Sequence, residues 1–149
     1  MSNQVQVENG YTIQEAARLT GLPESTLRYY ENIGIIAPIQ RDRRSKHRVY
    51  SEDDLNILTS IACLSATGMS IVDMRTYISN RERGAQAAAE QIQLLQKQKD
   101  HLAVEAEHIK VRQKYVGLKI DYWHAVANGQ AERAELIASE SRKLIKNLR

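Results

Sequence analysis

The hydrophobic and polar positions of this chain change their spacing near residue 85, which predicts two regions. Before that point, short runs with helical spacing alternate with turn residues such as Gly21, Gly34 and Gly68, a pattern typical of several short helices around one core. After it, apolar residues recur at alternating steps of four and three, which predicts one long helix. The expected parts are a flexible N-terminus at 1–10, a compact domain at 11–82, a long helix at 85–128 and a final helix at 130–149.

The compact domain opens with a pattern that predicts two short helices at a steep angle. Thr12 and Glu15 have the spacing of a capping box, in which each side chain accepts from a free N–H of the first helical turn. We expect a buried face on this helix, a turn at residues 20–22, Pro23 in the first turn of the second helix, and a stop at Gly34. The expected buried residues are Ile13, Ala16, Ala17, Leu19, Leu27, Tyr30 and Ile33.

Residues 41–48 read Arg-Asp-Arg-Arg-Ser-Lys-His-Arg, which places five fixed positive charges against one negative charge. The run lies between two short apolar segments, residues 35–36 and 49–50, and we interpret it as a hairpin, here called the wing. A basic loop of this kind can lie along a phosphate backbone and release its counterions. The alternative is a solvated surface loop, which the position directly after a helix pair disfavours.

The rest of the compact domain is predicted to be helical. Ser51 and Asp54 cap a helix by the same logic as Thr12 and Glu15, and Gly68 separates it from a further helix over residues 71–79. The inward side chains are expected to be Leu55, Leu58, Ile61, Ala62, Leu64, Ile71, Met74 and Ile78.

The long helix carries a heptad seam interrupted by two polar positions, Lys99 and Gln113. A helix of this length is not stable alone, so we expect a homodimer through this seam; the alternative is a helix folded back on its own domain. The expected dimerisation residues are Ile92, Leu95, Leu102, Ala106, Ile109, Val116 and Ile120. After Gly129 the final helix repeats the seam and is expected to pack on the partner's coil or domain.

Residues 11 to about 80 resemble the DNA-binding domain of the MerR family of bacterial transcription regulators. The resemblance rests on three segments: Arg28-Tyr29-Tyr30-Glu31, Gly34-Ile35-Ile36-Ala37-Pro38 and Arg48-Val49-Tyr50. It implies a mainly α fold with a winged helix-turn-helix domain, followed by a long antiparallel coiled-coil dimerisation helix and a short C-terminal helix. One departure is at the wing tip, where family members commonly have glycine and an aromatic residue and this chain has Lys46 and His47.

The resemblance also implies a function, namely a sequence-specific transcription regulator that acts as a homodimer on a two-fold promoter operator by distorting the DNA. Its partners would be double-stranded DNA, a second copy and, through the promoter, RNA polymerase. The DNA contacts it implies, together with the hydroxyl and cationic groups beside them, are Thr12, Ser25, Thr26, Arg28, Tyr29, Arg43, Arg44, Lys46, His47, Arg48 and Tyr50. The competing classes are a DNA-architectural or excisionase-like protein and a coiled-coil adaptor for an acidic protein.

Two places are candidates for sensing an effector. Cys63 lies in a stretch that resembles the one bearing the reactive cysteine in the aldehyde- and thiol-stress-sensing branch of the family, although a lone cysteine beside Ile61 and Leu64 is more typical of a small buried hydrophobe. Tyr115, Tyr122 and Trp123 could line a pocket for an apolar or cationic ligand, but such rings are more often core or dimer packing.

Composition restricts the function further. The chain has 149 residues, a net charge of +3, one cysteine, no long apolar stretch and no signal peptide, so we expect a cytoplasmic protein without a membrane segment or internal disulfide. The seam region lacks the cysteines of soft-metal sensors, and His101, Glu105 and His108 fit a solvated face better than a zinc site. Without a phosphate loop or nucleophile elbow, we expect no enzyme activity, cofactor or metal.

Overall fold

A computed structural model describes residues 10–148, which fall into two compact units that divide between Gln96 and Lys97. Residues 10–96 are called the head below. The predicted flexible N-terminus lies outside the described residues except for Gly10, where an added Cβ would lie 2.2 Å from Val49 Cγ1. Gly10 therefore permits a close approach of two chain segments that alanine would push apart. None of the described helices is long and apolar enough to cross a membrane.

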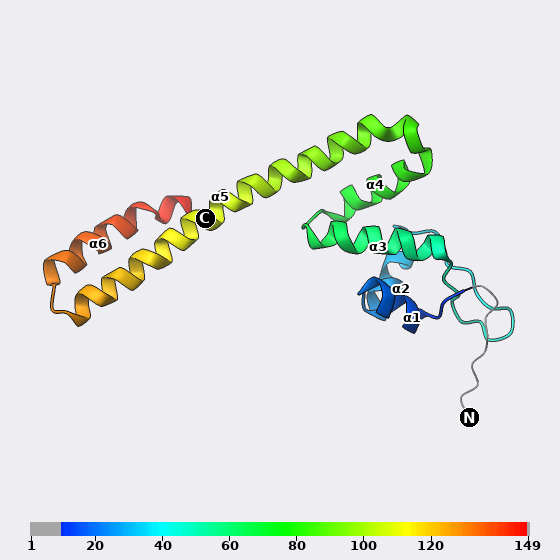
Figure 1. Cartoon of the computed structure of the whole chain (residues 1–149), viewed down its shortest axis with the longest axis horizontal. Coiled ribbons are helices and arrows are strands. Elements are labelled where there is room, and N and C mark those ends of the chain that lie inside the picture. The colour runs from blue at the N-terminus through cyan, green and yellow to red at the C-terminus, as the bar shows by residue number, and fades with distance from the viewer. Residues whose placement is uncertain (1–9, 149) are drawn as a thin grey trace, which may run out of the picture. The chain divides into compact units, whose positions relative to one another are not determined.

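The head begins with the predicted helix pair, α1 (Ile13–Thr20) and α2 (Glu24–Asn32) (Figure 1). The capping box is confirmed, because Glu15 N–H donates to Thr12 Oγ1 and Thr12 N–H donates to a Glu15 carboxylate oxygen, both at 3.2 Å. Gly21 ends α1 with a φ of 73°, which glycine adopts without strain. Pro23 is the residue before α2 and not part of its first turn.

Two further helices, α3 (Glu52–Ala66) and α4 (Ile71–Arg83), complete the core of the head. The predicted Ser51 and Asp54 capping box is present at the start of α3. Side chains from all four helices and the segments between them form one core, which contains Ala16, Leu27, Tyr30, Ile35, Ile36, Ile39, Tyr50, Leu55, Leu58, Ile61, Met69, Met74 and Ile78.

Two residues expected in this core lie at the surface. Leu19 is exposed because the buried stripe of α1 runs through Ala16 and Thr20, and Leu19 projects to the side of that stripe. Ile71, the first residue of α4, is also exposed, whereas Met74 and Ile78 of the same helix are buried. Ile33 is partly buried and packs against the core.

The wing is held by single residue pairs. Among the described residues the only β pairing consists of two isolated antiparallel bridges, Arg41 with Arg48 and Tyr11 with Tyr50. Tyr11 and Tyr50 exchange two backbone hydrogen bonds of 2.8 Å, which attach the entry of α1 to the exit of the wing. The wing is therefore joined to the helix pair at its base and projects from it as a loop.

The long helix is α5 (Ala88–Ala127), 40 residues preceded by a short 3-10 turn, η1 (Gly84–Ala87). Gly117 lies inside α5 without ending it. The large side chains of the predicted seam are all exposed on the single chain: Ile92, Leu95, Leu102, Ile109, Val116, Ile120 and Trp123. The heptad pattern thus corresponds to a real apolar stripe that the chain does not cover by itself.

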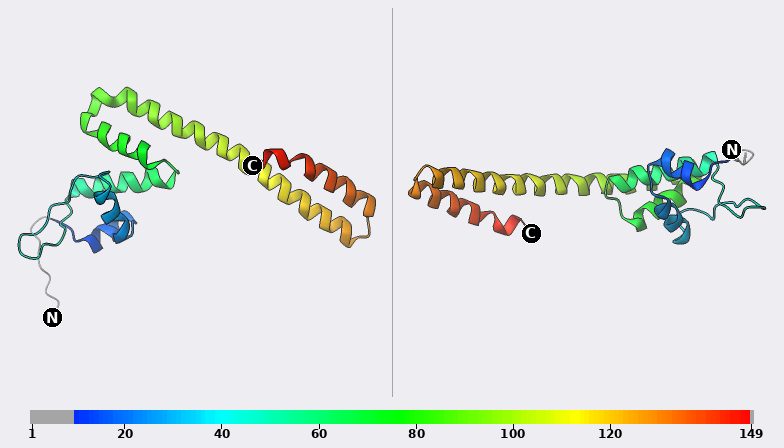
Figure 2. Two further views of the ribbon diagram at one scale, coloured as in Figure 1. Left: turned by 180° about the vertical axis from the view of Figure 1, so that it is seen from behind. Right: turned by 90° about the horizontal axis from the view of Figure 1, so that it is seen from below.

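The last helices are α6 (Ala131–Lys143) and the 3-10 turn η2 (Ile145–Asn147). α6 turns back after Gly129 and runs beside the end of α5 in each view of Figures 1 and 2. Its Ala134 and Ser141 are already buried within one chain, so one face of this helix packs on its own chain, and packing on the partner stays a prediction. The less exposed residues of α5 in this region form a second stripe of Val111, Tyr115, Leu118, Tyr122 and Ala125.

Candidate nucleic-acid interface

The outward face of α2 carries the side chains expected to contact DNA. Ser25, Arg28 and Tyr29 are exposed and Thr26 is partly buried, while Tyr30 is buried as predicted. This division follows from the helical period, because Tyr30 lies three residues after Leu27 on the inward side. Hydroxyl, guanidinium and phenol groups are suited to phosphates and base edges. The helix therefore presents a polar reading surface on a buried support.

The turn of the wing is organised by one carboxylate. Asp42 Oδ1 accepts hydrogen bonds from the backbone N–H of Arg44 at 2.9 Å, from the N–H of Ser45 at 2.7 Å and from Ser45 Oγ at 3.0 Å. These donors, the Ser45 backbone first among them, lower the pKa of Asp42 below its ordinary value because they favour the charged form. The neighbouring Arg43 and Arg44 side chains remain exposed at the tip.

Lys46 has an unusual backbone conformation. Among the described residues it is the one non-glycine with a positive φ, 63°, a left-handed conformation that costs an L-residue about 1–2 kcal/mol. Its N–H donates to Asp42 O at 2.9 Å, and its carbonyl accepts from Arg41 Nη1 at 3.1 Å. The wing tip thus keeps a turn suited to glycine although a lysine occupies it.

The base of the wing is fastened to α2 by Glu31. Arg48 Nε donates to Glu31 Oε1 at 2.7 Å, and Ile39 N–H donates to the other oxygen at 3.4 Å. The side chains of Arg48 and Glu31 are only 21% and 13% exposed. Arg48 therefore positions the wing, a role that sequence reasoning missed. The only signal for it was Glu31 at the end of the Arg-Tyr-Tyr-Glu segment.

Tyr50 does not belong to the interface. Its side chain is fully buried, so the prediction that it contacts DNA is wrong; the ring fills the core below the wing. Burial raises the pKa of its hydroxyl, which has no hydrogen-bond partner among the described residues. Tyr11, which pairs with its backbone, donates its own hydroxyl to Glu52.

A cationic cleft of about 310 Å³ lies where α1, α2 and the wing meet. The lining contains no acidic residue and consists of Thr12, Ile13, Arg28, Arg41, Lys46, His47 and Arg48. An anionic group such as a phosphate fits this lining, because hydroxyl and guanidinium groups donate to its oxygens. Of the predicted contacts, Ser25, Thr26, Tyr29, Arg43 and Arg44 lie outside the cleft. Arg41 was not among the predicted contacts, although it begins the basic run.

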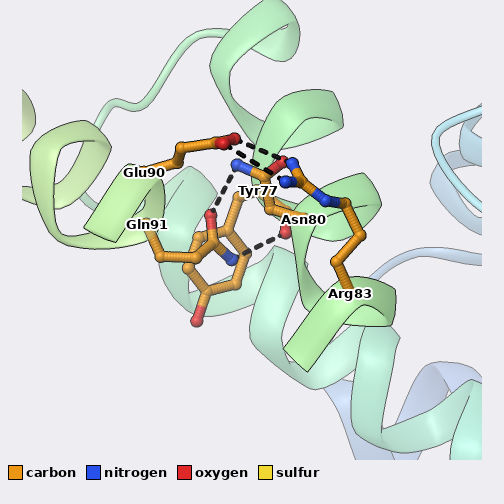
Figure 3. A network of polar contacts seen from close by, with 5 residues as sticks. All are labelled: Tyr77, Asn80, Arg83, Glu90 and Gln91. Carbon is orange, nitrogen blue, oxygen red and sulfur yellow. Dashed lines mark hydrogen bonds and ion pairs between the residues drawn. The ribbon is translucent and has the colours of Figure 1, made fainter. Parts of the chain in front are cut away.

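The joint between α4 and α5 is built from side-chain hydrogen bonds (Figure 3). Asn80 Nδ2 donates to Gln91 Oε1 at 3.2 Å, and Gln91 Nε2 donates to the Tyr77 carbonyl at 2.9 Å. Beside them, Arg83 forms two hydrogen bonds with Glu90, at 2.9 and 3.3 Å. Because Asn80 is buried, these contacts fix the first turn of α5 against α4 within the head.

Comparison with known proteins places this architecture in a family. The model for MerR helix-turn-helix family regulatory proteins matches residues 11–81. A probable heavy metal-dependent transcriptional regulator of Haemophilus influenzae is 32% identical over 117 residues, which cover 78% of this chain and 88% of that protein. This chain belongs to the MerR family. The described structure accordingly combines the family's winged helix-turn-helix with a long helix after it.

Two further relatives support the assignment. The uncharacterised HTH-type transcriptional regulator YyaN of Bacillus subtilis is 37% identical over 70 residues, or 47% of this chain, and the match spans only about half of YyaN, 50%. The crystal structure of HiNmlR, a MerR family regulator lacking the sensor domain and bound to promoter DNA, superposes with a TM-score of 0.67 at 25% identity. That superposition covers 85% of this chain and 94% of HiNmlR.

The structure also locates the candidate sensing residues. Cys63 is exposed, so the expectation that it is a buried hydrophobe is wrong; Ile61 takes the inward position on α3. Tyr115 and Tyr122 lie on the stripe beside α6, whereas Trp123 is 64% exposed and meets Tyr122 edge-on at 5.3 Å. Lys119 Nζ already lies 5.3 Å from the Tyr115 ring, where a cationic ligand would bind.

The metal-ligating side chains of the described residues do not gather into a site. Within residues 10–148 no group of three or more histidine, cysteine, aspartate or glutamate side chains is arranged to hold a metal ion. His101 Nε2 lies 3.3 Å from Glu105 Oε1 in an exposed pair on one helix face. This arrangement is that of a solvated helix surface.

Proposed function

We propose that this MerR-family chain is a transcription regulator that binds double-stranded promoter DNA as a homodimer. The observation that carries the proposal is the cationic cleft between α1, α2 and the wing, whose lining includes Arg28, Arg41 and Lys46 and no acidic residue. Arg28 lies 3.7 Å from Glu24 in an exposed pair outside that lining. A phosphate of the DNA backbone occupies the cleft, and α2 enters the major groove. The promoter-bound neighbour HiNmlR supports this assignment.

The homodimer presents two heads to a two-fold operator. Phosphate contacts from the cleft and the wing supply affinity, while Ser25 and Thr26 on α2 read base edges. Distortion of the DNA between the two half-sites aligns the promoter for RNA polymerase, so the contact with polymerase runs through the promoter. Repression by occupancy would use the same protein–DNA contacts.

Mutagenesis separates the two kinds of DNA contact. Arg44→Ala should weaken binding to operator and unrelated DNA alike and lower the salt slope by about one, because one phosphate contact is lost. Thr26→Ala should change the preference among operator variants instead. Lys114→Ala, which removes an exposed charge from α5, is the control and should leave both properties unchanged. Equal salt slopes for Arg44→Ala and the wild type would refute the wing contact.

A second candidate function is a response to electrophiles or oxidants through Cys63, which its exposure on α3 favours. A reactive thiol must be accessible, and a bulky or charged adduct on α3 would then alter the head that contacts DNA. Alkylation of the native protein, followed by mass spectrometry and transcription from the target promoter, tests this role. Failure of Cys63 to react before unfolding, or an unchanged response in Cys63→Ser, excludes it.

A further inference from the structure

The exposed seam of α5 has a spacing that accepts another helix of the same kind. Seam residues such as Leu102, Ile109 and Val116 are exposed and follow one another at steps of seven. A stripe of this length stabilises a helix only when it is covered. A second copy of this chain is the occupant, an inference that rests on the homodimer proposed above.

The family resemblance implies an antiparallel pair; within it, we propose a single register of the two copies of α5, in which Leu102 faces the partner's Gln113 and Ala106 faces the partner's Ile109. We call this the central register. A parallel pair would instead place Lys99 directly against the partner's Lys99 inside the seam, and two like charges brought together in a desolvated interface oppose association.

Overlap favours the central register. In it the two copies of α5 overlap along the whole helix, so that Ala88 is level with the partner's Ala127. A shift by one heptad in one direction leaves Ile92 beyond the end of the partner's helix, and a shift in the other direction leaves Trp123 there. Both side chains are large and about two-thirds exposed, 66% and 64%, so either shift forfeits apolar burial.

Charge beside the seam selects the same register. Glu105 and Arg112 each directly precede a seam residue, and in the central register Glu105 faces the partner's Arg112 twice by symmetry. One heptad shift brings Glu105 against the partner's Glu105. The other shift brings Arg112 against the partner's Arg112 and Lys110 against the partner's Lys110. Opposite charges at such flanking positions set register, whereas like charges disfavour it.

The second of these shifts has two compensations, each formed twice by symmetry. It places Lys99 near the partner's Trp123, where a cation–π contact can form, and it places Glu105 against the partner's Lys119. Against them stand the Arg112–Arg112 and Lys110–Lys110 pairs, which meet at the symmetry axis, and the loss of Ile92 of both copies from the seam. The central register keeps its opposite-charge pairs without these like-charge pairs and covers Ile92.

The register has a consequence for DNA recognition. A one-heptad shift displaces one protomer along the other by about 10 Å, since a helix rises 1.5 Å per residue. That is nearly a third of the roughly 34 Å that separates half-sites one DNA turn apart. Charges beside the coil thus limit which operator spacing both heads can contact together.

Cysteine cross-linking of the full chain tests the register directly. In a Cys63→Ser background, Leu102→Cys/Gln113→Cys should give a covalent dimer under mild oxidation, because these positions face each other only in the central register. Leu95→Cys/Gln113→Cys and Leu102→Cys/Ile120→Cys are matched controls for the two shifted registers. Leu102→Cys alone tests the parallel pair. All three controls should remain mainly uncross-linked on non-reducing gels.

The outcomes separate this inference from the proposed function. A dominant cross-link in any control overturns the central register while leaving the homodimer intact. A monomer in sedimentation experiments on the Cys63→Ser background overturns the homodimer and the register with it. A noncovalent dimer in which no pair cross-links also overturns the register.

Charge reversal provides an independent readout. Glu105→Lys and Arg112→Glu should each raise the dimer dissociation constant about tenfold at low salt, because each creates two like-charge contacts. The combined variant exchanges the signs and should return to within about twofold of the wild type. Additive weakening in the combined variant would show that Glu105 does not face the partner's Arg112.

Discussion

The head and the region from Lys97 onward bury their apolar side chains in different ways. In the head, Leu58 and Ile61 of α3 are completely buried by the chain's own segments. On α5, Ile109 and Val116 remain about half exposed, 50% and 56%. The head therefore closes its own core, whereas the coil leaves a stripe that association must cover. With the homodimer proposed above, head stability should be intramolecular and coil stability should depend on protein concentration.

Polar contacts differ in the same way. The head joins distant segments, as when Arg75 Nη2 donates to the Ile33 carbonyl at 2.7 Å or Arg48 pairs with Glu31. The coil pairs near neighbours on one exposed face, as Lys110 does with Glu107 at 2.8 Å. Exposed pairs of this kind contribute little to stability. The head is therefore specified by its own long-range contacts, whereas the contacts that the exposed stripe of α5 makes would come from the proposed partner helix.

The strongest test of this difference is Leu102→Asp. A carboxylate in the middle of the seam would be buried without a partner in the dimer, at a cost of about 3–5 kcal/mol. Sedimentation should show a monomer, and operator affinity should fall with it. Val104→Asp provides the control, because Val104 is exposed and lies off the seam. A fully dimeric Leu102→Asp protein would contradict the coiled-coil interpretation.

A cavity in the core of the head should affect stability differently from a charge in the seam. Leu58→Ala should lower the free energy of unfolding by about 2–5 kcal/mol, through lost burial and an unfilled cavity. Because the contacts are intramolecular, the loss measured for the head transition should not change with protein concentration. Val72→Ala, at the surface of α4, should stay within about 0.5 kcal/mol of the wild type. A concentration-dependent loss in Leu58→Ala would remove the distinction between the two regions.

Removing a hydrogen bond from the joint of Figure 3 should change the orientation of α5 more than it changes the free energy of unfolding. Gln91→Ala leaves Asn80 and the Tyr77 carbonyl without these hydrogen bonds, which should cost about 1–3 kcal/mol. The dimer should persist, while affinity for a two-site operator should fall more than affinity for a single half-site. Gln93→Ala, an exposed glutamine on the same helix, is the control. Equal losses on both DNAs would argue against a positioning role.

The smallest expected effect concerns the wing. Asp42→Ala removes the acceptor for the Arg44 and Ser45 amides and should weaken DNA binding a few-fold without changing the fold. Because the pKa of Asp42 is lowered in the folded state, its contribution is fully present above the ordinary aspartate pKa and lost as pH falls through the lowered value. Amide shifts of Arg44 and Ser45 in a pH titration should report that midpoint. A midpoint at or above the ordinary aspartate pKa would contradict the hydrogen-bonded turn.

Local features of the fold were predictable from the sequence because they depend on residues within about one helical turn. The capping boxes of Thr12 and Ser51, the left-handed Gly21 and the stop at Gly129 each follow from side chains or backbone freedom at fixed offsets. The heptad stripe of α5 and the basic wing were equally visible, since a periodic pattern and a charge run are properties of a single segment.

Tertiary structure alone decided which of these residues face inward or pair across the chain. Tyr50 is buried and Arg48 is held by Glu31, 17 residues away, although both were expected to contact DNA from the wing. Cys63 and Leu19 are exposed, and α6 lies beside its own α5. Burial and long-range pairing depend on which segments contact one another in the folded chain, and side-chain type and local spacing do not specify those contacts.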